Sequence, residues 1–290
     1  MKKIIALAVA GAFVAPAFAA DVTLTGEVEY TYSSTDGVNA FATSQADLLI
    51  TATETLDNGM TVSAYVSPEA ASGAPDNTDT LLTLTGGFGE LTVGDDGDYG
   101  YNAFDNKTDV ASSGGDFEID SGNANTIGGV QFKPNLGVEG LSLAIGYAAG
   151  DAAGEEESGF GVQYAAGGFA VSYGKADVDG DDTNASHVSL SYSSGPFYVA
   201  YDNYETQGGT DGDATTAIAG TYSMGDIKLF VERGTIQDAT NMDVNDTVYG
   251  LEYGLGPLDL YIVQITDQTA ASATTYTEAD TTRVGVEYQF

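Results

Sequence analysis

The chain has 290 residues, and 43 Asp and Glu outnumber 8 Lys and Arg, which gives a formal net charge of −35. This balance excludes nucleic acid as a partner, because phosphate binding depends on Lys and Arg, and it favours cations. The chain has no cysteine, which excludes disulfides, thiolate metal sites and thiol chemistry. With 38 glycines, 18 tyrosines and only 6 prolines, the composition indicates many strands and turns and not low-complexity disorder.

Residues 1–19 have the layout of a secretory signal peptide. Two lysines precede an apolar stretch at 4–14 that is too short to span a bilayer, and Ala-Phe-Ala at 17–19 forms a cleavage site. We therefore predict an exported protein whose mature chain is residues 20–290. No later apolar run reaches about 20 residues, so the sequence predicts no transmembrane helix.

Apolar and polar side chains alternate with a period of two through most of the mature chain, which is the pattern of strands with two different faces. In residues 141–147, for example, leucine, isoleucine and tyrosine alternate with serine, alanine and glycine. The pattern predicts about sixteen strands, at 21–33, 44–55, 60–67, 79–85, 90–94, 126–133, 141–148, 159–164, 169–175, 185–192, 197–204, 215–224, 226–233, 247–255, 258–266 and 281–290.

Short turns containing Gly, Asn or Pro alternate strictly with long polar loops. The long loops are predicted at 33–43, 67–78, 95–125, 149–158, 176–184, 205–214, 234–246 and 267–280. Strict alternation of this kind is typical of an antiparallel up-and-down transmembrane β-barrel, whose apolar face contacts lipid and whose polar face lines water. Tyrosine and phenylalanine near strand ends fit interfacial aromatic girdles. A soluble β-sandwich has the same period, so a secreted acidic protein with adhesive or calcium-binding work stays an alternative.

The third long loop, residues 95–125, is the most acidic stretch of the chain. It contains a single base, Lys107, and eight acids. The acids are Asp95, Asp96, Asp98, Asp105, Asp109, Asp116, Glu118 and Asp120. Alone, the loop has the composition of a solvated linker. A segment of this length between strands of one kind is instead usually functional.

Four stretches resemble the general diffusion porins of Gram-negative bacteria. Residues 44–69 resemble the second and third strands of that family, and LTLTGGFGELTVGD at 82–95 resembles the segment that leads into its third loop. SGPFYVA at 194–200 resembles a Gly-Pro-Phe turn of the family. The C-terminal VGVEYQF resembles the family's last strand, which ends in an aromatic residue. The resemblance extends over the whole mature chain.

The resemblance implies an all-β, sixteen-stranded outer-membrane barrel that forms a homotrimer, with residues 95–125 folded inward as the pore constriction. It also implies outer-membrane lipid and lipopolysaccharide as surroundings, and Phe290 as the signal to the barrel assembly machinery. The family commonly sets bases on its first strands opposite the loop acids. Here Glu27, Glu29 and Asp47 occupy those positions, and Asp95 replaces the family's usual Arg.

A porin performs no covalent chemistry, so no catalytic residue and no required cofactor is expected. We predict that the loop acids constrict the pore and that five side chains line its wall, namely Glu27, Glu29, Asp47, Lys228 and Arg283. Carboxylate rings attract cations, so the sequence predicts a cation-selective channel for passive diffusion of small hydrophilic solutes. A channel on the same barrel that prefers particular small nutrients is the alternative.

Two further signals concern metals and catalysis. Asp116, Glu118 and Asp120 alternate in sequence, and such dense carboxylates favour weak calcium binding, unless they only keep the outer surface charged. Residues 177–182 space their acids like a calcium loop, but the glycine is misplaced and the required Glu is absent, which excludes an EF-hand. His187 stands near serines, but adjacency in sequence is not triad geometry.

Overall fold

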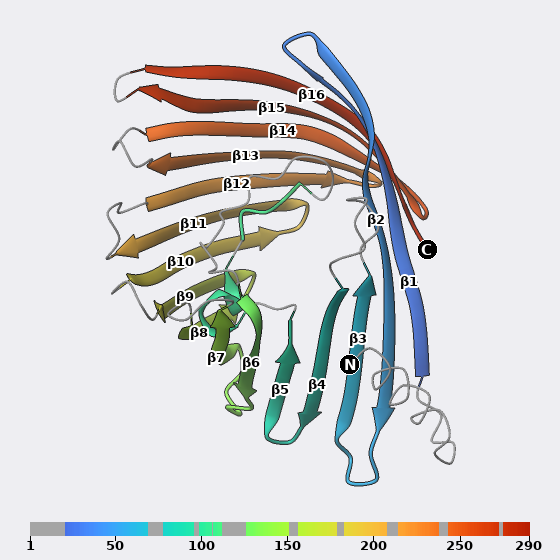
Figure 1. Ribbon diagram of the computed structural model, residues 1–290, viewed down its shortest axis with the longest axis vertical. Helices are drawn as coiled ribbons and strands as arrows, with labels where there is room; N and C mark the ends of the chain where they lie inside the picture. Colours follow the sequence, from blue (N-terminus) through green and yellow to red (C-terminus); the bar gives the residue numbers. More distant parts are fainter. Residues whose placement is uncertain are drawn as a thin grey trace.

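The structure is a computed structural model that describes residues 21–68, 78–95, 99–105, 107–111, 126–150, 156–178, 183–207, 214–237, 243–272 and 275–290. In it, sixteen strands form one closed antiparallel barrel. Each strand pairs with its neighbours in sequence, and β1 closes the ring against β16, seen as the blue and red strands side by side in Figure 1. The predicted up-and-down barrel is therefore confirmed.

The elements follow one another as hairpins, with one 3-10 helix after the fifth strand. Their bounds are β1 Asp21–Thr35, β2 Val38–Thr55, β3 Thr61–Pro68, β4 Thr78–Gly86, β5 Gly89–Gly94, η1 Gly100–Phe104, β6 Thr126–Pro134, β7 Leu141–Gly150, β8 Glu157–Ala166, β9 Phe169–Val178, β10 Thr183–Ser194, β11 Phe197–Gln207, β12 Ala214–Met224, β13 Ile227–Gln237, β14 Asp243–Leu255, β15 Leu258–Ser272 and β16 Thr275–Gln289.

The two faces of the barrel wall are chemically opposite. Large apolar side chains are exposed on the outer face, among them Leu24 (58%), Ile218 (60%) and Ile262 (51%). Alternate residues such as Ala144 and Ser189 point inward and are fully buried. Each Å² of apolar surface left in water costs about 25 cal/mol, and soluble monomers rarely expose large apolar patches. An apolar belt around the outside is therefore suited to lipid, which excludes the alternative of a secreted soluble β-protein.

Aromatic side chains gather at the strand ends near the short turns. Phe169 packs against Tyr192 with ring centroids 4.3 Å apart, and Phe197 packs against Tyr222 at 4.8 Å. Phe169, Tyr192 and Phe197 are also exposed on the outer face of the barrel. This arrangement is that of an interfacial girdle.

The predicted loop at 33–43 is wrong, because the strands continue through it. β1 runs to Thr35 and β2 begins at Val38, so only Asp36 and Gly37 separate them. Both turn residues have positive φ, 49° and 84°, as a two-residue type I′ hairpin turn requires. Asp-Gly is the sequence signal for this turn. The polar residues on both sides of it led to the prediction of a long loop. The hairpin projects at the top of Figure 1.

The predicted loop at 267–280 is wrong for the same reason. β15 and β16 pair through most of it, and only residues 273–274 lie between the two strands. Beyond the apolar belt both faces of a hairpin contact water, so the alternation of apolar and polar residues ends although the pairing continues. Threonine, which is abundant here, favours strands without adding to that alternation.

The C-terminus lies in the seam that closes the barrel. The backbones of Gly26 and Phe290 exchange two hydrogen bonds, each 2.9 Å long. A β-carbon on Gly26 would lie 2.7 Å from Cζ of the Phe290 ring, so the glycine leaves the space that this ring occupies. The role of Phe290 as an assembly signal stays a prediction.

Candidate pore

Residues 99–105 and 107–111, which are described parts of the predicted constriction loop, lie against the inner face of the barrel. η1 contacts β7, β8, β9 and β10, near which it is drawn in Figure 1. Ser172 Oγ donates a hydrogen bond to the carbonyl oxygen of Phe104 (2.7 Å), and the Gly100 amide donates to Gln131 Oε1 (3.2 Å). Ser172 and Gln131 are on the face opposite the apolar outer belt. The segment therefore lies inside the ring of strands.

Polar contacts attach the second half of this segment to β11. The backbone amide and the hydroxyl of Thr108 both donate to Asp202 Oδ2, at 2.6 and 2.8 Å. Tyr198 donates from its hydroxyl to the carbonyl oxygen of Lys107 (2.7 Å). Tyr204 donates to the carboxylate of Asp105. One strand thus holds three positions of the segment through side chains that alternate along its inner face.

An apolar contact follows directly after the polar ones. Val110 and Ala111 pack into a buried cluster on β12–β15 that includes Phe230, Val248 and Val263. These side chains face inward, where a water-filled barrel usually carries polar groups. Covering them removes their apolar surface from water, which stabilises the position of the segment.

His187 is part of the support under η1. Its ring is 1% exposed and lies between the rings of Tyr101 and Tyr204, with centroid distances of 6.1 and 5.6 Å. Among the described residues, neither ring nitrogen has a hydrogen-bond partner, and Ser189 Oγ has none either. A nucleophile and its base must be hydrogen-bonded to each other, so the arrangement does not support catalysis.

Acidic side chains gather on another part of the inner wall, formed by β14–β16, β1 and β2. Glu27 lies directly opposite Asp47 in the strand register, and Glu287 lies opposite both Glu29 and Asp259. Like charges directly opposite each other destabilise a sheet. The wall acids predicted from the sequence are therefore neighbours.

The predicted wall bases also lie on the inner face, within the acidic region. Lys228 Nζ is 2.7 Å from Glu252 Oε2, so its charge is balanced by the wall itself. Arg283 on β16 stands between Ser33 and Val263 in the register. Both bases lie away from η1, which contacts β7–β10.

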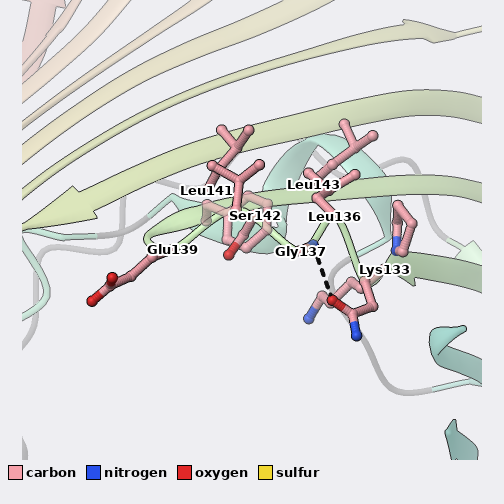
Figure 2. A pocket seen from close by; sticks show the side chains of 11 residues that line it. Lys133, Leu136, Gly137, Glu139, Leu141, Ser142 and Leu143 are labelled. Atoms are coloured by element: carbon pink, nitrogen blue, oxygen red, sulfur yellow. Dashed lines mark hydrogen bonds between the residues drawn. The ribbon is translucent and has the colours of Figure 1, made fainter. Parts of the chain in front are cut away.

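A third inner-face base, Lys133, was not predicted from the sequence. Its Nζ is 4.0 Å from Glu90 and 5.9 Å from the ring centre of Phe104 in η1. Figure 2 shows Lys133 beside the β6–β7 turn, which is shaped by a hydrogen bond of 3.1 Å from the Gly137 amide to Asn135 Oδ1. Together they border a cavity of about 380 Å³.

The predicted constriction residues fall into three groups. Asp105, Lys107 and Asp109 belong to the segment on the inner wall, and Asp109 is exposed there. Asp95 instead accepts hydrogen bonds from the amide and hydroxyl of Thr80, and so caps the end of β4. The rest lie outside the described residues: Asp96, Asp98, Asp116, Glu118 and Asp120.

Sequence reasoning missed most of the buried inner-wall acids. They include Glu157, Asp202, Glu232 and Glu252, each at most 8% exposed. Continuing the period-two pattern along each strand places them on the inner face, so a signal was present. What the sequence does not show is which acids lie under residues 99–111 and which border open space.

The described part of the chain contains no helix with the length and apolarity needed to cross a membrane. It also contains no group of three or more His, Asp or Glu side chains arranged to hold a metal ion. The predicted calcium ligands lie outside the described residues.

Comparison with known families decides the identity of the chain. Residues 6–290 match the family model of Gram-negative porins. The chain belongs to the Gram-negative porin family. It is thus an outer-membrane channel protein and not an enzyme, and the resemblance seen in the sequence is confirmed. The porin has no significant match among curated proteins.

Solved porin structures share its fold. The porin superimposes on an anion-selective porin from Comamonas acidovorans with a TM-score of 0.76 at 17% identity, and on a mutant porin of Rh. blastica with 0.69 at 16%. Each alignment covers 93% of this chain and 100% of the other. In bacterial outer-membrane barrels the short turns face the periplasm and the long loops face outward.

Proposed function

We propose that this porin is a cation-selective channel for passive diffusion of small hydrophilic solutes, with residues 95–125 as its constriction. The observation that carries the proposal is the inner-wall cluster of Glu27, Asp47, Asp259 and Glu287, together with the exposed Asp109 on the segment inside the barrel. Charged rings of one sign select ions of the other sign.

The proposed cation selectivity rests on the charge of the lumen and not on the fold. The Comamonas acidovorans porin has the same fold and is described as anion-selective. In this chain the first strands present acids to the lumen, and Lys228 is already paired with Glu252. The electrostatic potential in the lumen is therefore expected to be negative on both sides of the path that ions take.

Selectivity is tested by the reversal potential of the purified porin in a planar bilayer under a tenfold KCl gradient. We expect the dilute side to become positive, because cations cross more readily, approaching but not reaching roughly 59 mV, the limit for one charge. The preference is expected to weaken in concentrated salt, because the screening length falls from about 30 Å at 0.01 M to about 3 Å at 1 M. A negative dilute side would contradict the proposal.

The same recording separates the two channel types. A general diffusion pore shows no saturable block by an added solute, whereas a substrate-preferring channel does.

We also propose that the porin is a homotrimer, embedded in outer-membrane lipid and lipopolysaccharide and delivered by the barrel assembly machinery through Phe290. The apolar outer belt and the seated C-terminal ring support this proposal. Weak calcium binding at Asp116, Glu118 and Asp120 is proposed on their sequence alone.

A further inference from the structure

Three glycines on adjacent strands lie directly beneath η1. Gly146, Gly161 and Gly174 are on β7, β8 and β9, and Gly161 is opposite Gly174 in the register. None of them has a positive φ, so their backbone conformation does not demand glycine. Glycine in a strand interior weakens the strand and often marks the close approach of another backbone.

The second backbone is that of η1. A β-carbon on Gly146 would lie 2.4 Å from the amide nitrogen of Gly100, and one on Gly161 would lie 2.7 Å from the Gly100 carbonyl oxygen. A β-carbon on Gly174 would lie 2.2 Å from the carbonyl oxygen of Tyr101. Ordinary van der Waals contact begins at 3.4 Å. The nearest atom at each position is a backbone atom, which cannot turn aside as the end of a side chain can. At Gly146 all three nearest atoms are backbone atoms, whereas a β-carbon on Gly174 would also lie 2.3 Å from the His187 ring.

The segment has a matching glycine on its own side. Gly100 has φ +69°, and a β-carbon there would lie 2.6 Å from the carbonyl oxygen of Gly159. Next to it Tyr101 is 0% exposed and rests on His187. The contact is thus made backbone against backbone, with an aromatic side chain filling the adjoining space.

We propose that Gly146, Gly161 and Gly174 set the bore of the pore by allowing η1 to lie flat on the inner wall. Any side chain at these positions would have to lift η1 toward the lumen. For Gly146, restoring ordinary contact requires a shift of about 1 Å, from 2.4 to 3.4 Å. These glycines are positioning residues, and their role rests on the proposed function of residues 95–125 as the constriction.

The test is the single-channel conductance of Gly146→Ala, Gly161→Ala and the double variant in planar bilayers. We expect a loss of conductance in each single variant and a larger loss in the double variant, because η1 moves into the path. Gly220→Ala is the matched control. It adds the same methyl group to a strand glycine, but its nearest neighbour would be 3.5 Å away, so conductance is expected to stay at the parental value.

Folding is checked by heat-modifiable migration in detergent gels. If Gly146→Ala does not fold, Gly161→Ala decides, because its closest loop atom is farther away. Parental or increased conductance in a folded Gly161→Ala variant would overturn the proposal. The reversal potential of the parental porin tests the proposed function separately. An absence of cation preference would contradict the proposed selectivity, but the conductance of the glycine variants could still be compared with that of the parental porin.

Discussion

Replacing Glu27 by Gln together with Asp47 by Asn is expected to lower the cation preference of the porin and to raise its thermal stability. Both side chains are half-buried on the inner face, and they stand directly opposite each other on β1 and β2. The substitutions remove two negative charges from the lumen, so the reversal potential moves toward zero. They also relieve a like-charge pair, which is worth about 0.2–1 kcal/mol.

The two readouts together separate a functional role from a structural one. The reversal potential is measured in a salt gradient, and stability is measured as the temperature at which the folded gel band is lost. Glu205→Gln with Asp280→Asn is the matched control, because it removes one Glu and one Asp that are exposed near the long-loop end of the strands. Equal shifts of the reversal potential in both pairs would show that wall charge in the lumen does not determine selectivity.

Replacing Asp202 by Ala is expected to release part of the constriction segment from the wall. The carboxylate is fully buried and accepts two hydrogen bonds from Thr108, which is fully buried as well. Hydrogen bonds to charged groups contribute about 1.5–3 kcal/mol each. Burial of Asp202 also has a cost, because Oδ1 has no partner among the described residues. The two orphaned donors of Thr108 outweigh that cost, so Asp202→Ala should show noisier current and a larger mean conductance.

Two control variants, Asp202→Asn and Asp259→Ala, show whether the increased current noise comes from the lost hydrogen bonds to Thr108. Asp202→Asn keeps an acceptor for Thr108 without the cost of burying a charge, so it should retain near-parental current noise. Asp259→Ala removes an equal charge from another part of the inner wall, and it should change selectivity but not noise. In a double-mutant cycle, Asp202→Ala and Thr108→Val should be non-additive because they share one contact. Quiet, parental current in Asp202→Ala would contradict the anchoring role.

The barrel itself was predictable because the environment on each side of its wall determines the residue type at each strand position. Lipid on one side and water on the other impose a period of two, which residues 141–147 display plainly. The signal fails where that contrast ends. Around Asp36 and Gly37 both faces contact water, so the strands extend farther than the alternation does. Only the Asp-Gly turn chemistry marked that hairpin.

The candidate pore was predictable in its parts and not in its contacts. Alternation placed Glu27, Asp47 and Lys228 on the inner face, because side-chain direction follows from strand position. It did not show that Lys228 pairs with Glu252, or that Asp202 holds Thr108, because these pairings depend on register and on the path of a loop. Residues distant in sequence meet there, and no local pattern encodes the meeting.

In the proposed channel, an acidic segment inside the barrel borders the path of ions. Because the chain has no cysteine, Asp109→Cys creates a single thiol at the exposed position of that segment. The most direct measurement is the current through this variant while a cationic or an anionic methanethiosulfonate of similar size is added, with Glu205→Cys on the outer face as control. We predict a stepwise loss of current at Asp109→Cys alone, and faster reaction with the cationic reagent. Unchanged current in fully labelled Asp109→Cys, or faster reaction with the anionic reagent, would show that this segment does not border the path of cations.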